Sequence, residues 1–394
     1  MEILCLKRQQ QQSKRLPFHI YFWTTVVLSL AGLLVAVYLS ISHYRVYTDV
    51  AYKSFCAISR SINCDTVSQS PFSVFMGIPV PIWGVIGYFF FLLLLVQARL
   101  SEAERIRVWP TLFFLSMLFS IYSIILAVIS TFLIQSLCIM CIVSYGINFL
   151  LLYYTWIARR RFSGDPIMPG LKNDFKFFWQ HTAHRSFVLL PFFSAVLVTI
   201  IIFPKYWSFE PPRLSADMPV GVTEDGHPWV GAENPRVIIT EFTDYQCFQC
   251  NKMHFYLRQL MVDHPGKVRV VHRHFPMDHT VNPLVKRPVH VGSGVLALLA
   301  IYAGTQDKFW QMSDLLFSIA RQMQKIDTRF LAERTGLDAR ALSRAVRDRR
   351  IRSKLGQDIA DGLKLGVRGT PTFIVNGTVY KGQIPAQILA KILD

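Results

Sequence analysis

The chain has 394 residues, of which 52% are hydrophobic and only 17% are charged, and its mean hydropathy is +0.32. Ordinary soluble proteins carry about 25% charged residues, so this composition excludes a wholly soluble protein and indicates a membrane protein with a soluble portion. The net charge of +17 could suggest nucleic-acid binding. Much of the basic charge flanks apolar segments, however, as the positive-inside rule describes for cytoplasmic loops. We therefore expect the lipid bilayer as a partner and no nucleic acid.

Five apolar segments approach or reach the roughly 20 residues that cross a hydrocarbon core: residues 19–42, 78–98, 109–133, 137–157 and 187–203. No small-residue cleavage pattern follows the first segment, so we expect an uncleaved helix. With the N-terminus in the cytoplasm, the polar loop 43–77 and everything after residue 203 lie outside. The proline-rich residues 204–220 suit an extended linker.

The seven cysteines form three pairs and one single residue: Cys56 with Cys64, Cys138 with Cys141, Cys247 with Cys250, and Cys5 alone. A structural disulfide scaffold is denser and occupies a smaller domain, so these pairs favour working dithiols. In the expected topology all three pairs face one compartment. Cys5 lies in a polar, basic tail, residues 1–17, where it would face the reducing cytosol, and we assign it no role.

The fourth apolar segment carries a CxxC pair. A helix places residues i, i+3 and i+7 on one stripe, so Cys138, Cys141 and Tyr145 are expected to share a face. Small apolar residues used for helix packing are the alternative interpretation of such a pair. The two further cysteine pairs favour a dithiol.

Residues 221–394 have the length and pattern of a soluble α/β domain. We expect strands and helices in the following order: strand 237–245, helix 248–264, strand 267–275, mostly helix over 284–365, a hairpin formed by 372–375 and 378–380, and helix 384–393. The Asn376-Gly377 pair between the last two strands is a strong two-residue turn signal. A large helical insertion therefore separates the first strands from the final hairpin.

The segment Cys247-Phe248-Gln249-Cys250 lies between an expected strand and an expected helix. This places Cys247 at the helix tip, where unpaired N–H groups and the helix dipole favour a thiolate. Cys250 follows one turn later, close enough for a disulfide. A zinc site would need two more ligands at metal-like spacing. Because His254 and His264 do not supply that pattern, we expect no metal.

This arrangement resembles the thioredoxin family. Glu241 stands six residues before Cys247, where the family carries a buried acid that assists proton transfer at the resolving thiol. Thr370-Pro371 stands just before a strand, where the family carries a cis-proline loop facing the dithiol. The long insertion resembles the larger periplasmic oxidoreductases of the DsbA type. The resemblance implies a catalytic set of Cys247, Cys250, Glu241, Thr370 and Pro371.

Residues 18–157 resemble the vitamin K epoxide reductase family, which pairs two loop cysteines with a membrane CxxC beside a quinone. Cys56 and Cys64 have the seven-residue gap of that family. Ser70 and Gly77 occupy family-like positions six and thirteen residues after Cys64. The amide that vertebrate members carry in the second span has no counterpart near Val80-Pro81.

The same resemblance assigns the cofactor site. Tyr145, four residues after Cys141, matches the tyrosine that borders the quinone in family members. We therefore expect Cys141, Tyr145 and Ser70 to contact ubiquinone or menaquinone. The expected fold is a membrane all-α helical bundle, a four-helix vitamin K epoxide reductase-like core plus a fifth transmembrane helix, followed by an α/β thioredoxin-like domain with a helical insertion. Residues 158–186 would form a cytoplasmic loop before the fifth helix, 187–203.

The two resemblances imply a thiol:quinone oxidoreductase in the bacterial cytoplasmic membrane, with its C-terminal domain in the periplasm or outside. Electrons would pass from extracytoplasmic protein thiols to the membrane quinone pool through three pairs in series: Cys247/Cys250, Cys56/Cys64 and Cys138/Cys141. A reductive conduit serving an outer isomerase is one alternative, although it needs cysteines accessible from both sides of the membrane. A membrane-tethered chaperone with structural disulfides is another.

Overall fold

The computed structural model describes residues 17–49, 52–58, 62–100, 108–163, 166–180, 182–202, 206, 218–319, 327–385 and 387–389. The chain divides into two compact units, Met1–Val46 with Tyr52–Lys205, and Tyr47–Ala51 with Tyr206–Asp394. We call these the helical unit and the α/β unit. The expected cytoplasmic tail with Cys5, and nearly all of the expected linker, lie outside the described residues.

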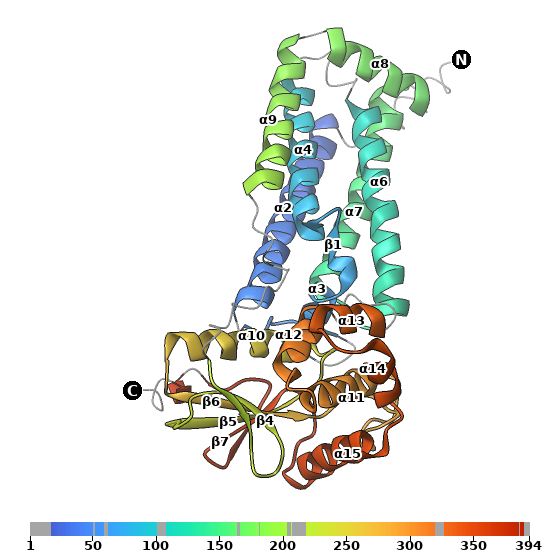
Figure 1. Ribbon diagram of the computed structural model, residues 1–394. Coiled ribbons are helices and arrows are strands. Elements are labelled where there is room, and N and C mark those ends of the chain that lie inside the picture. The colour runs from blue at the N-terminus through green and yellow to red at the C-terminus, as the bar shows by residue number, and fades with distance from the viewer. Residues whose placement is uncertain are drawn as a thin grey trace, which may run out of the picture. The chain divides into compact units, whose positions relative to one another are not determined.

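The helical unit is built from long apolar helices (Figure 1): α2 (Phe18–Thr48), α4 (Val80–Leu100), α6 (Trp109–Val128), α7 (Ile139–Ala158) and α9 (Thr182–Ile202). The predicted helical bundle is confirmed. Among the described residues three helices are long and apolar enough to cross a membrane: Phe18–Thr48, Trp109–Ile134 and Ile139–Ser163. The other two expected spans contain shorter apolar stretches, Val80–Val96 and Leu189–Val198.

Helix α8 (Ile167–Gln180) occupies part of the segment expected to be a cytoplasmic loop. Phe175 and Trp179, one helical turn apart, are exposed and stack their rings at 5.8 Å. Asp174 fixes the helix to the start of α6, since its carboxylate accepts hydrogen bonds from the backbone and the hydroxyl of Thr111. Because lysines are interspersed among the apolar residues of this helix, the sequence shows no continuous apolar run here, and the helix was not predicted.

Small polar residues on α6 face α7. Ser116 Oγ lies 2.8 Å from Thr155 Oγ1, and Ser120 donates a hydrogen bond to the backbone oxygen of Asn148. Small side chains let membrane helices approach closely, and hydroxyls satisfy each other where no water is present. This contact aligns the two helices along the stripe of α7 that begins with Cys141.

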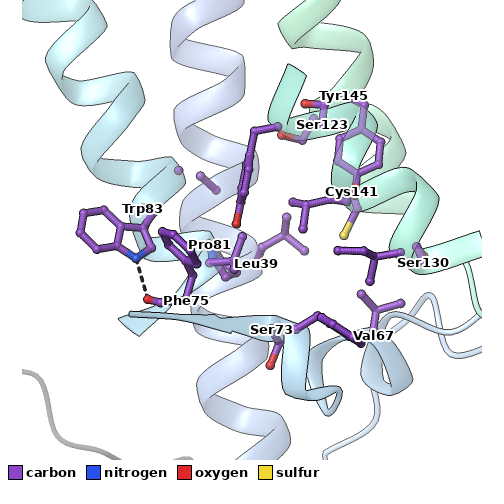
Figure 2. A pocket seen from close by; sticks show the side chains of 18 of the residues that line it. Leu39, Val67, Ser73, Phe75, Pro81, Trp83, Ser123, Ser130, Cys141 and Tyr145 are labelled. Carbon is purple, nitrogen blue, oxygen red and sulfur yellow. Dashed lines mark hydrogen bonds between the residues drawn. The ribbon is translucent and has the colours of Figure 1, made fainter. Parts of the chain in front are cut away.

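A short cap joins α2 to α4. It consists of α3 (Cys64–Ser68), a 3₁₀ turn (Pro71–Ser73), and the strands β1 (Val74–Phe75) and β2 (Ile78–Pro79). Met76 and Gly77 turn the hairpin with φ of 52° and 73°, a conformation that favours glycine. Trp83 Nε1 on α4 donates to the Phe75 backbone oxygen at 3.1 Å, which ties the hairpin to the helix (Figure 2).

The α/β unit contains a six-stranded sheet in the order β3-β4-β6-β5-β7-β8. The strands are β3 (Val220–Val222), β4 (Pro228–Gly231), β5 (Val237–Thr243), β6 (Val268–His274), β7 (Thr372–Val375) and β8 (Thr378–Lys381). β5 and β6 are parallel, whereas β7 runs antiparallel to β5. The predicted strands and final hairpin are confirmed, but the β3–β4 hairpin was not expected.

Helix α10 (Phe248–Asp263) follows β5, and a helical insertion separates β6 from β7: α11 (Ser293–Gly304), α12 (Phe309–Ile319), α13 (Thr328–Thr335), α14 (Ala339–Ala345) and α15 (Arg349–Lys364). The insertion becomes helical at Ser293, later than the expected residue 284. The Asp278 carboxylate explains the delay, because it accepts hydrogen bonds from the backbones of Thr280, Gly292 and Gly294 and holds the preceding loop. Of the expected last helix, 384–393, residues 384 and 385 are not helical and residues 387–389 are helical; the others lie outside the described residues.

Each face of the sheet has its own core. Ile239 on β5 packs with α10, α11 and α12, whereas Phe242 packs with Phe275 and α15. Because side chains alternate along a strand, Glu241 points to the same face as Ile239, toward the core that also contains Cys250. A carboxylate is therefore buried on the face of the sheet that the dithiol helix covers.

Candidate functional site

Four cysteines of the helical unit gather in one place. Cys56 is bonded to Cys64 and Cys138 to Cys141, with Cα–Cα separations of 5.7 and 5.2 Å. The two predicted pairings are therefore present as disulfides. Cys56, Cys64 and Cys138 are buried in one apolar cluster, and the half-buried Cys141 packs against it. This juxtaposition allows exchange between the two disulfides, because thiol–disulfide exchange requires sulfur atoms to meet.

Backbone pairing brings the two disulfides together. Ile62 and Leu137 form an isolated parallel bridge, and the Asn63 N–H donates to the Leu137 oxygen at 2.9 Å. The Asn63 side chain also caps α3 by accepting hydrogen bonds from the backbones of Asp65 and Thr66. The start of α3 is thus held beside the start of α7. The pairing with Leu137 was not predictable, because it joins segments far apart in the sequence.

Cys138 is the N-cap of α7, and its Sγ accepts a hydrogen bond from the Cys141 N–H at 3.2 Å. Cys141 and Tyr145 then follow on one stripe of the helix, as predicted. Both line a cavity of about 600 Å³, and so does Ser70 from the cap. Figure 2 shows Cys141 and Tyr145 on one side of this cavity and Trp83 of α4 across from them. The three residues expected to contact a quinone therefore share one cavity.

The walls of this cavity suit a quinone. Most of the lining side chains are aliphatic or aromatic, among them Leu39, Phe119 and Trp83. A few hydroxyl, phenol and amide groups interrupt the apolar surface, including those of Ser70 and Tyr145. Small-molecule sites usually combine an apolar lining with a few placed polar groups. A quinone needs apolar contact for its ring and hydrogen-bond donors for its two carbonyl oxygens.

The cavity also contains a polar network that the sequence analysis missed. Tyr88 on α4 donates to Asn148 Oδ1 at 2.6 Å, and Asn148 Nδ2 donates to Ser123 Oγ at 2.8 Å. All three residues line the cavity. Asn148 stands seven residues after Cys141, on the same stripe of α7. An amide inside an apolar span marks a functional position, so this signal was present in the sequence.

The third cysteine pair lies in the α/β unit and is in the dithiol form. Cys247 is the N-cap of α10, and its Sγ accepts a hydrogen bond from the Cys250 N–H at 3.3 Å. The Cys247 thiol also donates to the Thr370 backbone oxygen at 3.5 Å. The Thr370–Pro371 peptide bond is cis, as predicted. The structure therefore places the cis-proline loop next to Cys247.

The two thiols differ strongly in acidity. A hydrogen bond from the Cys250 thiol lowers the pKa of Cys247 to about 7, against the effect of burial and with help from His290. Burial raises the pKa of Cys250 well above its usual value. Because the thiolate is the attacking species, Cys247 is the thiol of this pair that is better suited to attack a disulfide. Cys250 needs a base before it can attack.

Asp244 organises the loop that presents Cys247. Its buried carboxylate accepts hydrogen bonds from the Gln246 and Met277 backbones, from Ser293 Oγ and from His290 Nδ1. These partners come from three separate segments of the chain. Asp244 was not predicted as a functional residue, because most of its hydrogen-bond partners lie far away in the sequence and no local motif indicates them.

Glu241 is 1% exposed, and its Oε1 lies 3.0 Å from His272 Nδ1 on the neighbouring strand. Burial raises the pKa of Glu241 above its usual value, which favours the protonated carboxyl. The sequence analysis assigned no role to His272 or His274. The alternation along the strand does not distinguish histidines that lie beside Glu241 from histidines that are simply packed in the core. Their position beside Glu241 could therefore not be inferred.

Two parts of the chain match models of known families. Residues 23–156 match the model of the vitamin K epoxide reductase family, and residues 223–394 match a thioredoxin model. The chain thus joins a stretch similar to the vitamin K epoxide reductase family to a stretch similar to thioredoxin. The two matches cover the helical unit with its four cysteines and the α/β unit with its CxxC, respectively.

Curated relatives share only part of the chain. A Na(+)/H(+) antiporter NhaA 3 of Salinispora tropica is 31% identical over 174 residues, which are 44% of this chain and 25% of that protein. A Na(+)/H(+) antiporter NhaA 1 of Mycobacterium sp. (strain KMS) is 27% identical over 213 residues, covering 51% of this chain and 33% of that protein. The chain thus spans about a quarter to a third of the length of these relatives.

Solved structures with similarity include a thioredoxin-like oxidoreductase from Silicibacter pomeroyi DSS-3, with 25% identity and a TM-score of 0.35, covering 43% of this chain and 91% of that one. The thiol-disulfide exchange protein alpha-DsbA2 of Wolbachia pipientis has 22% identity and a TM-score of 0.34, covering 42% of this chain and 85% of that one. Each covers less than half of this chain.

Proposed function

We propose that the protein is a thiol:quinone oxidoreductase that introduces disulfides into extracytoplasmic proteins. The position of Cys141 carries this proposal: it packs against the buried cysteine cluster and also lines the cavity that suits a quinone. Cys141 thus lies next to the other three cysteines of the cluster and also next to the cavity that would hold the electron acceptor. The match of the two domains to the vitamin K epoxide reductase and thioredoxin models supports the same function.

Electrons would enter at Cys247. A substrate thiolate attacks the Cys247–Cys250 disulfide, a second substrate thiolate releases the oxidised substrate, and two electrons remain on the dithiol. The dithiol then reduces Cys56–Cys64, which in turn reduces Cys138–Cys141. Each new substrate disulfide releases two electrons and two protons, which a bound quinone would accept as the terminal oxidant.

The helical unit would hold the acceptor through its own side chains. Tyr145 and Ser70 supply hydroxyl groups, and the Tyr88–Asn148 network supplies an amide on the stripe of Cys141. We place the domain with Cys247, together with the cysteine cluster of the helical unit, on the periplasmic or outer side of the bacterial cytoplasmic membrane. All three cysteine pairs would then work in one compartment, as series transfer requires.

The test is quinone consumption by the purified full chain with a reduced substrate protein. Ubiquinone and menaquinone analogues are supplied in separate reactions, and their absorbance and the substrate disulfides are followed together. We expect one quinone consumed per disulfide formed. Cys141→Ala should stop quinone consumption yet leave at most two substrate disulfides per chain, one from the pre-formed Cys247–Cys250 disulfide and one from the Cys56–Cys64 disulfide.

Cys5→Ser is the matched control, because it removes the one cysteine to which we assign no role, and it should turn over like the unmodified chain. Continued multiple turnover by Cys141→Ala would contradict the proposal, since the acceptor would then receive electrons elsewhere. A chain that oxidises substrate without consuming either quinone would contradict the proposed acceptor.

A further inference from the structure

Three buried side chains form a hydrogen-bonded row across β5 and β6. Glu241 and His272 are register partners on the two parallel strands, and His274 lies two residues further on the same face of β6. Glu241 Oε1 is 3.0 Å from His272 Nδ1, and His272 Nε2 is 3.2 Å from His274 Nδ1. All three side chains are at most 3% exposed. The row is therefore continuous and shielded from solvent.

The far ends of this row have no partner among the described residues. Glu241 Oε2 and His274 Nε2 are buried polar atoms without a hydrogen bond in the structure. Buried polar groups are nearly always paired, so two open ends on one connected row require an explanation. A path that receives a proton at one end and releases it at the other has this form.

The row begins where a proton must be moved. Glu241 lies on the face of β5 that α10 covers, in the core that contains Cys250. Cys250 has no solvent exposure, and its thiol must lose a proton before it attacks the mixed disulfide at Cys247. Glu241 can take that proton directly or through one water. Glu241 is itself buried, however, so the proton needs a further route before the next cycle.

We propose that His272 and His274 extend Glu241 into a relay that removes the Cys250 proton during reoxidation of the dithiol and returns one during substrate oxidation. This inference rests on the proposed function of the dithiol. When Glu241 is protonated, it donates to His272 Nδ1, His272 Nε2 donates to His274 Nδ1, and His274 Nε2 gives its proton to a water molecule that reaches this buried end of the row. Each imidazole changes tautomer and stays neutral, and one proton leaves per Cys250 thiolate formed.

The surroundings keep the imidazoles neutral. The rings of Tyr245, Phe309 and Trp310 pack around His272, and burial lowers the pKa values of both His272 and His274 well below the usual value. A neutral imidazole has one donor and one acceptor nitrogen, which is what a relay needs. The charged and titratable groups facing the row come from four elements: His254 and Arg258 of α10, Asp314 of α12, His227 beside β4, and Lys354 and Asp358 of α15.

A titratable pair lies beside His274 at the end of the sheet. The backbone N–H of His274 donates to Asp358 Oδ2 at 3.1 Å, and Asp358 Oδ1 lies 3.3 Å from His227 Nδ1. His227 directly follows exposed turn residues between β3 and β4. Burial raises the pKa of Asp358 to about 6, so this carboxyl can change its protonation state near neutral pH.

The relay can be tested by separating the two thiol steps. In the full chain with Cys5 and the other four cysteines of the helical unit replaced by serine, reduced Cys247 attacks oxidised glutathione, and Cys250 then resolves the mixed disulfide. Acid quenching and intact-mass analysis give the rate of each step across pH 5 to 9. We expect His272→Gln to slow the Cys250 step roughly tenfold or more, within the range of general acid–base effects. The Cys247 step should change less than about twofold, since a proton relay contributes nothing to a pre-formed thiolate.

A double variant distinguishes a relay from independent effects. Because Glu241 and His272 would act in sequence, Glu241→Gln with His272→Gln should be no slower than Glu241→Gln alone. The exposed His279→Gln is the control and should leave both steps unchanged. If His272→Gln does not fold, His274→Gln at the end of the row is expected to show the same selective slowing.

The relay would be overturned if His272→Gln slowed the Cys247 and Cys250 steps equally or left the rate of the Cys250 step unchanged. It would also be overturned if the rate losses of Glu241→Gln and His272→Gln multiplied in the double variant. A smaller solvent deuterium isotope effect on the Cys250 step in His272→Gln would support it. Failure of the unmodified dithiol to react with glutathione would instead contradict the proposed function, so the two failures are distinguishable.

Discussion

Removing the Cys250 thiol should make Cys247 less acidic. The hydrogen bond from Cys250 is the largest influence that lowers the pKa of Cys247 from 9.0 to about 7. A lowering of two pKa units corresponds to about 2.7 kcal/mol in favour of the thiolate. Cys250→Ala removes that donor, and we expect the pKa of Cys247 to move toward 9.0. Cys250→Ser retains a hydroxyl donor and should leave the pKa nearer 7.

The expected size of the effect follows from two opposing factors. At pH 7 a pKa of 7 leaves half of Cys247 as thiolate, whereas a pKa of 9 leaves about 1%, a loss of about fiftyfold. The less acidic thiolate is more nucleophilic by about six- to tenfold over two pKa units. The net loss in alkylation rate at pH 7 is therefore at most about five- to eightfold for Cys250→Ala.

The assay is the rate of iodoacetamide alkylation of Cys247 against pH, with the modified peptide identified by mass spectrometry. In the unmodified reduced chain the rate should fall as pH drops through about 7, because the thiolate is protonated. The midpoint should rise in Cys250→Ala and much less in Cys250→Ser. Equal midpoints in all three proteins would refute the role of the Cys250 hydrogen bond.

Three further predictions concern the path and the acceptor. An impermeant thiol reagent applied from outside after reduction should label Cys247 and Cys56 but not Cys5; labelling of Cys5 would reverse the orientation. Cys64→Ser should accumulate an internal mixed disulfide between Cys56 and the CxxC of the α/β unit, seen on non-reducing gels, because the resolving thiol is lost; its absence would indicate another partner. Asn148→Leu should raise the KM for quinone by about fivefold or more, on the loss of a buried hydrogen-bonding group, while the single-turnover rate at the CxxC of the α/β unit stays unchanged; an unchanged KM would remove the amide from the quinone site.

The predictable part of the fold followed local patterns. Helices α2, α6 and α7 were predicted because their segments are long and apolar enough to span a membrane. The hairpin of β7 and β8 was predicted from the Asn376-Gly377 turn between them. Helix α8 was missed because its lysines break the apolar run that a span shows, leaving an exposed apolar face that only the helix reveals. The β3–β4 hairpin was missed because its strands are three and four residues long.

The candidate site was predictable where spacing carried the chemistry. The CxxC pairs, the stripe from Cys141 to Tyr145, and Glu241 six residues before Cys247 are all local relations. Asp244 and the Glu241–His272 contact depend on strands and loops meeting across the sheet. No spacing rule encodes such contacts, because the partners are separated by tens of residues and chosen by the fold.

The most direct test of series transfer is the redox state of each cysteine pair in Cys141→Ala. Excess reduced substrate is added with quinone present, free thiols are trapped, and every cysteine is read by mass spectrometry. We expect both Cys247/Cys250 and Cys56/Cys64 to accumulate as dithiols, whereas the unmodified chain keeps them largely oxidised. A Cys56–Cys64 pair that stays disulfide-bonded while Cys247/Cys250 is reduced would contradict the transfer of electrons between the two units.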